Sequence, residues 1–240
     1  MQDLISIQDV EDHLGLGPNG ALVYCQSFLH SNIDWLLNKI SESDADYFII
    51  DTPGQVETYS IDTKLKEILE KIKAKAKIEF TCVHLTDSQY CTDTSLFISA
   101  MLVALAATVN LEMPFINILS KMDLLNQYGE LPFPLEFYTE EFEPDKLYSA
   151  VSVDSSEFGK KYGALTKELC NLVNGYGLVA FTPLDVTDKQ SMSNILQIVD
   201  KANGYALKSF VLGSDVLDIT GHEMIDHETT GIMREKYEDN

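Results

Sequence analysis

The segment YFIIDTPGQ at residues 47–55 decides the fold class of this chain, because an apolar run leads directly into a turn that carries a carboxylate. Apolar residues closed by an acidic one predict a buried strand of a parallel sheet, with Asp51 at its carboxyl end, where open α/β sheets bind ligands. An aspartate there can hold a Mg²⁺ ion through water. Gly54 lets a backbone N–H approach a phosphate group, and Gln55 can orient a water molecule. The alternative is an ordinary turn after a strand, since D-T-P-G is turn-rich in any protein.

Apolar runs and helical patterns alternate along the rest of the chain. Three more short apolar runs predict buried strands, at residues 80–85, 115–119 and 178–181. Stretches with apolar residues at helical spacing lie between and around them, at residues 22–40, 65–72, 94–110, 158–174 and 191–206. This alternation predicts an α/β fold with a mainly parallel sheet flanked by helices.

A second motif, Ser120-Lys121-Met122-Asp123, follows the predicted strand at residues 115–119 and is close to the N-K-x-D pattern that reads guanine. An aspartate can accept two hydrogen bonds from the N1–H and the exocyclic amino group of guanine, a donor pair that adenine lacks. The stem of a lysine can lie over the base. Taken alone, the motif is equally compatible with a helix cap, because serine followed by aspartate three residues later is a capping signature.

A third motif, Gly17-Pro18-Asn19-Gly20, precedes the helical stretch at residues 22–40. By itself it predicts a tight turn that leads into a helix, with Asn19 as the candidate N-cap. It gains functional weight only in combination with the other two motifs.

Together the three motifs resemble the GPN-loop GTPases, a family of P-loop NTPases, in showing G-P-N before a helix, then D-T-P-G-Q-V-E, then S-K-M-D. The likeness runs from about Leu4 to about Tyr205. It implies a P-loop NTPase-like fold and hydrolysis of GTP to GDP with Mg²⁺. It also implies a homodimer, or a heterodimer with a paralogous GPN-loop GTPase. A role in the assembly and nuclear import of RNA polymerases II and III follows from the resemblance too, with polymerase subunits or assembly factors as partners and a cytoplasmic location with shuttling to the nucleus.

The resemblance assigns roles on the phosphate side of the site. Gly17, Pro18 and Asn19 would form the GPN loop, with Asn19 reaching towards the partner's nucleotide as a catalytic residue. Four residues of the D-T-P-G-Q-V-E stretch match the family pattern. Asp51 would be the acid linked to Mg²⁺ through water, and Gly54 the γ-phosphate contact. Gln55 would be the water-orienting catalytic residue, and Glu57 a candidate catalytic residue without an assigned step.

On the base side, the resemblance implies that Lys121 and Asp123 bind guanine. Ser120 stands where many GTPases have asparagine. A serine or threonine at this position is a further point in which the chain resembles the family. A loop at residues 182–184, after the last predicted strand, is the candidate second contact with the base.

The family pattern opens with a strand, a G-x-x-x-x-G-K-[ST] loop and a helix, and the sequence contains none of these. The Gly159-Lys160 pair is followed by Lys161, so it does not complete the motif. The backbone cradle for phosphate, the phosphate-binding lysine and the Mg²⁺-ligating hydroxyl are therefore missing. We expect an incomplete gene product whose sheet is N-terminally truncated. The alternative function is a non-hydrolysing, partner-binding fragment, or a divergent member that has lost nucleotide turnover.

The composition excludes several other classes of protein. A chain of 240 residues with a formal net charge of -21 is not expected to bind nucleic acid by neutralising phosphates. A single arginine, Arg234, nearly excludes arginine-based recognition of anions. The 4 cysteines form no C-x-x-C pair, which favours reduced thiols over disulfides or zinc. The longest apolar run, residues 96–109, predicts a buried helix and no membrane segment.

The domain organisation expected from the sequence is one GTPase domain at residues 1–213, with a small inserted lobe at about residues 127–155. The segment PFPLEFYTEEFEP at residues 132–144 is acidic, aromatic and proline-rich. Its aromatic side chains either fill a small core of the lobe or dock a partner. Residues 214–240 hold eight acidic and two basic residues, which predicts a mobile or solvated tail.

Overall fold

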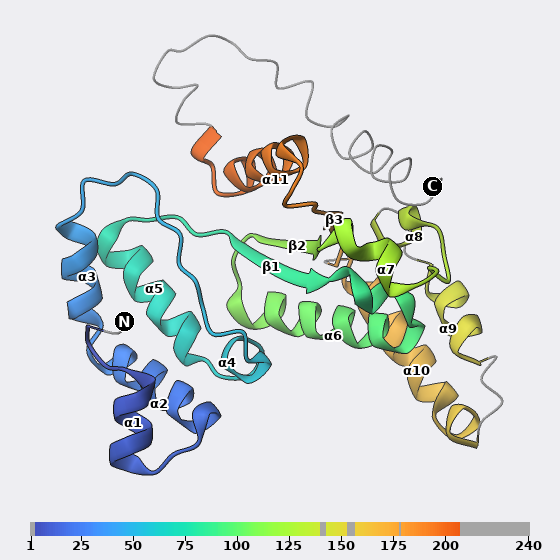
Figure 1. Cartoon of the computed structure of the whole chain (residues 1–240), viewed down its shortest axis with the longest axis horizontal. Coiled ribbons are helices and arrows are strands. Elements are labelled where there is room, and N and C mark those ends of the chain that lie inside the picture. Colours follow the sequence, from blue (N-terminus) through green and yellow to red (C-terminus); the bar gives the residue numbers. More distant parts are fainter. Residues whose placement is uncertain (1–2, 140–142, 153–156, 178, 207–240) are drawn as a thin grey trace, which may run out of the picture. The chain divides into compact units, whose positions relative to one another are not determined.

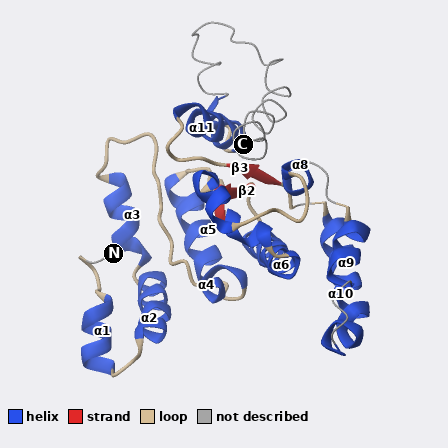
Figure 2. Cartoon of the chain, turned by 45° about the vertical axis from the view of Figure 1, so that its right-hand side comes forward, coloured by secondary structure: helices blue, strands red, loops and turns tan. Residues whose placement is uncertain are grey.

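The computed structural model of the chain describes residues 3–139, 143–152, 157–177 and 179–206 (Figure 1). The chain divides into two compact units, and each is described by itself. The first comprises Met1–Phe80 and Ala106–Glu112, and the second comprises Thr81–Leu105 and Met113–Asn240. Helices make up most of the described residues, as Figure 2 shows. The predicted tail at residues 214–240 lies outside the described residues, and the domain boundaries stay predictions.

The first unit is helical, with α1 (Ile7–Leu14), α2 (Pro18–Ser31), α3 (Ile33–Ser41), α4 (Val56–Ser60), α5 (Lys64–Ala76) and the last residues of α6 (Thr94–Leu111). Helix α1 begins at Ser6, whose hydroxyl accepts a hydrogen bond from the Asp9 N–H, and ends at Gly15, whose φ of 65° suits glycine. Helices α2 and α3 both pack against α5. Ile68 and Ile72 of α5 are buried one turn apart, which confirms the helix predicted at residues 65–72.

The single helix predicted at residues 22–40 is wrong, because α2 and α3 are separate helices joined at Asn32. Asn32 has a φ of -115° and a ψ of 34°, outside the helical range. Its side-chain amide donates to the Phe28 carbonyl at 2.9 Å, and this competition with the backbone ends α2. The prediction of Asn19 as N-cap is also wrong, since Gly17 occupies the N-cap position and Pro18 the first helical position of α2.

The strand predicted at residues 47–50 does not form. These residues belong to an irregular connection between α3 and α4, and the Ile49 side chain is 90 % exposed. A strand exists only where a neighbouring strand accepts and donates its backbone hydrogen bonds, and no described strand pairs with this segment. The apolar pattern was therefore not sufficient to make it a strand.

The second unit contains a parallel sheet of three described strands, in the order β1 (Cys82–Asp87), β2 (Phe115–Ser120) and β3 (Phe181–Pro183). The sheet confirms the strands predicted at residues 80–85 and 115–119 and the predicted α/β fold class with a parallel sheet flanked by helices. The last strand is shorter than predicted and begins at Phe181. The other elements of the unit are η1 (Ser88–Thr92), α6, η2 (Met122–Leu124), α7 (Leu125–Tyr128), α8 (Leu135–Thr139), α9 (Pro144–Ser152), α10 (Glu157–Tyr176) and α11 (Lys189–Ala202).

Helices cover both faces of the sheet, with α6 on one side and α11 on the other (Figure 1). Leu119 and Phe181 point towards α6 and join the main core. Ile116 and Ile118 point the other way and pack with Ile195 of α11. In the described part of the chain, α6 alone is long and apolar enough to cross a membrane by length and composition, and its residues in the core show why it is apolar.

Aromatic side chains of the predicted lobe fill the interior. Phe137 is 6 % exposed and Tyr138 is 4 % exposed, and both belong to the main core. Tyr138 meets Phe97 of α6 edge-to-face, with ring centroids 4.8 Å apart, and its hydroxyl donates to the Cys91 carbonyl at 3.0 Å. The core-filling alternative is therefore the correct one for these residues, although the core is shared with α6 and does not belong to the lobe alone.

One face of β1 exposes apolar side chains. Val83 and Leu85 of β1 stand opposite Ile116 and Ile118 on the same face, and they are 40 % and 62 % exposed. An exposed, apolar edge strand is a template for pairing with another chain.

Leu85→Lys should weaken self-association of the purified chain by about tenfold or more, because a charge on an edge strand opposes edge-to-edge pairing. Sedimentation velocity over a range of protein concentrations measures the effect. Leu172→Lys is the matched control, since Leu172 is 48 % exposed but lies on α10. Equal self-association of the Leu85→Lys variant and the unaltered chain would contradict the prediction.

Candidate functional site

The Ser120–Asp123 motif forms the turn at the carboxyl end of β2. Lys121 adopts a left-handed conformation with φ 61° and ψ 37°, and it occupies the N-cap position of η2. Ser120 Oγ donates to the Thr86 carbonyl at 3.1 Å, and Ser88 Oγ donates to the Lys121 carbonyl at 3.0 Å. These bonds tie the turn after β2 to the turn after β1. The capping alternative for Ser120 is wrong, because its hydroxyl bonds across the sheet.

The Lys121 side chain forms an ion pair that the sequence did not reveal. Its Nζ lies 2.6 Å from Oδ2 of Asp87, the last residue of β1, whose side chain is 22 % exposed. The hydrogen bond with Asp87 raises the pKa of Lys121, because a carboxylate favours the charged ammonium. The pair contributes to stability below the ordinary lysine pKa of 10.5, and this contribution is lost as the pH rises through the raised value. An acidic residue directly after a predicted strand was the available signal for Asp87.

Asp123 is half-buried in η2, and no hydrogen bond within the described part of the chain engages its carboxylate. Both carboxylate oxygens can therefore accept from a ligand. The neighbouring Met122 N–H donates to the Leu184 carbonyl at 3.2 Å, and the Leu184 N–H donates to the Leu119 carbonyl at 2.8 Å. The structure thus places the loop at residues 182–184 beside the motif, as a second contact with a base requires.

A second acidic residue missed in the sequence, Asp185, is fully buried after β3. Its Oδ1 accepts hydrogen bonds from the backbone N–H and the hydroxyl of Thr187, at 2.8 and 2.6 Å. The Asp185 N–H donates to Ser191 Oγ at 3.0 Å. These bonds shape the turn that leads from β3 into α11, so Asp185 has a structural role beside the loop at residues 182–184.

In the first unit, the structure brings two of the sequence motifs together. Gln55 Nε2 donates to Asn19 Oδ1 at 2.7 Å, so the turn at the start of α2 contacts the segment that leads into α4. Asp51, Gly54 and Glu57 are exposed. A Cβ built on Gly54 would meet no atom within 4 Å, so packing does not require a glycine there.

Two further residues hold this segment in place, and sequence reasoning missed both. Thr58 is 1 % exposed, and its hydroxyl donates to the Gln55 carbonyl at 2.6 Å and the Pro53 carbonyl at 3.3 Å. Gln26 Nε2, from α2, donates to the Thr58 carbonyl at 3.3 Å. A hydroxyl three residues after Gln55 was a weak local signal for Thr58, and nothing in the sequence pointed to Gln26.

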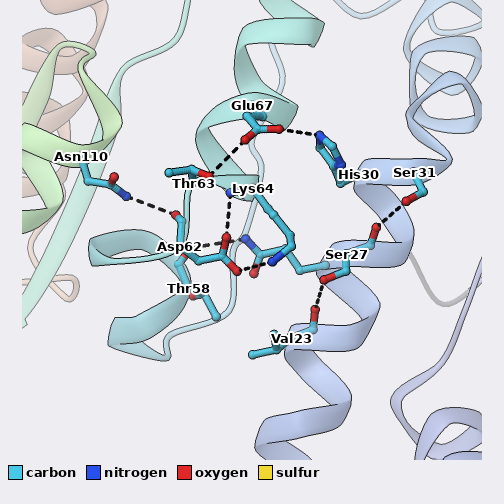
Figure 3. A network of polar contacts seen from close by, with 11 residues as sticks. Val23, Ser27, His30, Ser31, Thr58, Asp62, Thr63, Lys64, Glu67 and Asn110 are labelled. Carbon is cyan, nitrogen blue, oxygen red and sulfur yellow. Dashed lines mark hydrogen bonds and ion pairs between the residues drawn. The ribbon is translucent and has the colours of Figure 1, made fainter.

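A polar network fixes the connection from α4 to α5 (Figure 3). Asn110 Nδ2 donates to the Tyr59 and Asp62 carbonyls at 2.9 and 3.2 Å, and the Asp62 carboxylate pairs with Lys64. Across the same region, His30 of α2 lies 2.9 Å from the Glu67 carboxylate of α5. These contacts anchor the end of the segment that begins at Asp51.

The donor set suits a metal ion that arrives with a ligand. Within the residues that the structure describes, no three His, Cys, Asp or Glu side chains are grouped so that they could hold a metal. Asp51 offers one exposed carboxylate, which fits a Mg²⁺ ion held mainly by phosphate oxygens and water. Asp51 lies in the first unit and Asp123 in the second, so a crevice shared by the two carboxylates stays a prediction.

The chain matches one family model and is similar to proteins of known name. A family model described as "Conserved hypothetical ATP binding protein" matches residues 1–205. GPN-loop GTPase 2 of Danio rerio is 43% identical over 203 residues, which is 85% of this chain and 64% of the relative, so the chain spans just under two thirds of that protein. GPN-loop GTPase QQT1 of Arabidopsis thaliana is 37% identical over 242 residues, covering 99% of this chain and 80% of the relative.

A solved structure supports the fold. The crystal structure of a GTPase in apo form from Pyrococcus abyssi superposes with a TM-score of 0.64 and 22% identity, covering 84% of this chain and 77% of that one. At this identity the likeness shows the fold alone.

Asp87→Asn should lower the pKa of Lys121 towards its ordinary value, because the hydrogen bond with the Asp87 carboxylate is the largest cause of the increase. Asp123→Asn should lower the pKa of Lys121 less, since Asp123 makes no hydrogen bond with Lys121 and raises its pKa only weakly, through its charge. NMR titration of the lysine ε-carbon from about pH 9 to pH 12 measures both variants. Equal changes in the two variants would show that the Asp87 bond is not the dominant contact.

Proposed function

The chain belongs to the GPN-loop GTPase family, and on that premise we propose that it recognises a guanine nucleotide and supplies the water-orienting part of a GTP-hydrolysing site. The observation that carries the proposal is the turn after β2. There Asp123 keeps its carboxylate available, while Asp87 and Ser88 fix Lys121. The relatives are named GTPases, which supports GTPase activity for the family as a whole.

Base selection follows from the chemistry of Asp123. Its two oxygens accept from the N1–H and the C2 amino group of guanine, whereas adenine presents an acceptor at N1 and carries no amino group at C2. The stem of Lys121 can lie along the face of the base while its ammonium remains paired with Asp87. The loop at residues 182–184 would complete the base side of the site.

On the phosphate side, Gln55 would orient the attacking water. Its Nε2 is engaged by Asn19, which leaves Oε1 to accept a hydrogen bond from a water O–H. Asp51 would hold Mg²⁺ through water, and the ion would supply neutralisation of phosphate charge. Gly54 would offer its N–H to the γ-phosphate, and Glu57 remains a candidate catalytic residue without an assigned step.

Hydrolysis requires further groups. It would need a backbone cradle and a phosphate-binding lysine, and the 240 residues contain no G-x-x-x-x-G-K-[ST] motif to supply them. The family resemblance also motivates proposals about partners. We propose a homodimer or a heterodimer with a paralogous GPN-loop GTPase, a role in assembly and nuclear import of RNA polymerases II and III, and a cytoplasmic location with shuttling to the nucleus.

A second candidate function is partner binding without hydrolysis. It is favoured by the lack of the phosphate-binding motif within these residues, combined with the hydrogen bonds that hold Gln55 and the Lys121 turn. A fluorescent GTP analogue discriminates between the two functions, because a pure binding module would show no nucleotide binding.

The purified chain should bind GDP at least about tenfold more tightly than ADP, because guanine satisfies the Asp123 carboxylate with two hydrogen bonds. Asp123→Ala should remove most of this preference. Titration calorimetry measures both, with Glu130→Ala as the control, since Glu130 is an exposed acid in the same unit. Equal affinities for GDP and ADP would contradict guanine recognition.

Purified residues 1–240 should release no phosphate from GTP above background, because the sequence contains no G-x-x-x-x-G-K-[ST] motif to bind the β- and γ-phosphates. A colorimetric phosphate assay with Mg²⁺ measures the rate. Robust turnover that Gln55→Leu abolishes would defeat this prediction, and it would place the phosphate-binding groups among the residues present.

A further inference from the structure

Helix α2 is bonded to the segment from Gln55 to Thr58 at two points on one of its faces. Asn19 and Gln26 are seven residues apart, which is close to two helical turns, so their side chains project from the same side of α2. Asn19 Oδ1 accepts from Gln55 Nε2 at 2.7 Å, and Gln26 Nε2 donates to the Thr58 carbonyl at 3.3 Å. The two bonds hold both ends of the segment from Gln55 to Thr58.

Thr58 joins these two points through a tight local turn. Its N–H donates to the Gln55 carbonyl at 3.0 Å, and its hydroxyl donates to the same carbonyl at 2.6 Å. The hydroxyl also reaches the Pro53 carbonyl at 3.3 Å. Thr58 therefore fixes the backbone on both sides of Gln55 while its own carbonyl is held by Gln26.

The burial of Gln26 is otherwise difficult to explain. Its side chain is 5 % exposed, and its Oε1 has no hydrogen-bond partner among the described residues. Burying an amide oxygen without a partner costs free energy, and a leucine of similar size would avoid that cost. The amide is useful at this position because its N–H₂ group reaches the Thr58 carbonyl.

We propose that α2 is a two-point clamp that sets the orientation of the Gln55 amide, with Gln26 and Thr58 as positioning residues. The clamp engages Gln55 Nε2 through Asn19 and so leaves Oε1 as the hydrogen-bond acceptor of the amide. The functional meaning of the clamp, a fixed acceptor for the attacking water, rests on the proposed function. The clamp itself is a property of the chain without nucleotide, and Asn19 acts here on its own chain.

The test is NMR spectroscopy of the full chain without nucleotide. The side-chain amide signal of Gln55 is assigned by its loss in Gln55→Leu. Asn19→Ala should move this signal to the position of a solvated amide, and Gln26→Leu and Thr58→Val should each shift it as well. Thr58→Ser keeps the hydroxyl and should leave the signal in place.

Hydrogen exchange supplies a second readout. Gln26→Leu removes the bond to the Thr58 carbonyl and so loosens the turn in which the Thr58 N–H donates to the Gln55 carbonyl. Exchange of the Thr58 N–H should then accelerate by about fivefold, which is the equivalent of one hydrogen bond. Ser27→Ala is the matched control, because the Ser27 hydroxyl bonds to Val23 within α2 and lies next to Gln26 in sequence. This control should change neither the Gln55 signal nor the exchange of Thr58.

An unchanged Gln55 signal in both Asn19→Ala and Gln26→Leu, with the global melting temperature preserved, would overturn the clamp. Equal effects of Thr58→Ser and Thr58→Val would do the same, because the hydroxyl would then have no part in it. A chain that shows the clamp but binds no nucleotide would contradict the proposed function alone, so the two proposals fail separately.

Discussion

Backbone hydrogen bonding between neighbouring parallel strands is the constraint on which this structure depends. The β1–β2 ladder runs in register from Cys82 and Phe115 to Asp87 and Ser120, so both strands finish at the same level. This register brings the last residue of β1 beside the lysine that follows β2, and it lets serine hydroxyls cross between the two turns. The geometry of the Ser120–Asp123 motif is therefore a consequence of strand pairing more than of its own four residues.

The same constraint explains where the sheet stops. Residues 47–50 have the apolar composition of a buried strand, yet they stay irregular because no described strand is paired with them. At β1, Val83 and Leu85 have the alternating apolar pattern of a covered strand, yet they are exposed on the face that α11 covers further along the sheet. Both segments have the apolar side chains of a buried sheet, but no described strand or helix covers those side chains.

Prediction from sequence succeeded where a feature depends on composition and spacing. The apolar runs that became β1 and β2, the core helix α6 and the lysine-rich α5 all carry a local signal. It failed where a polar side chain chooses among distant partners. Asp87 pairs with a lysine 34 residues away, and Gln26 reaches a carbonyl 32 residues away. Such choices depend on which atoms the fold brings together, and single-sequence patterns do not encode them.

The charges of the residues at the proposed site favour recognition of a base over binding of a triphosphate. The chain has a formal net charge of -21, and the ammonium of Lys121 is already neutralised by Asp87. The turn after β2 therefore offers hydrogen-bond acceptors for a neutral base but no surplus positive charge for a triphosphate. Under the proposed function, base selection would need little more than the Asp123 carboxylate, because its energy would come from hydrogen bonds that adenine cannot make. Phosphoryl transfer instead develops negative charge that must be met by cations, so in the proposed function that step would depend on Mg²⁺ and on cationic groups that the sequence motifs found here do not supply.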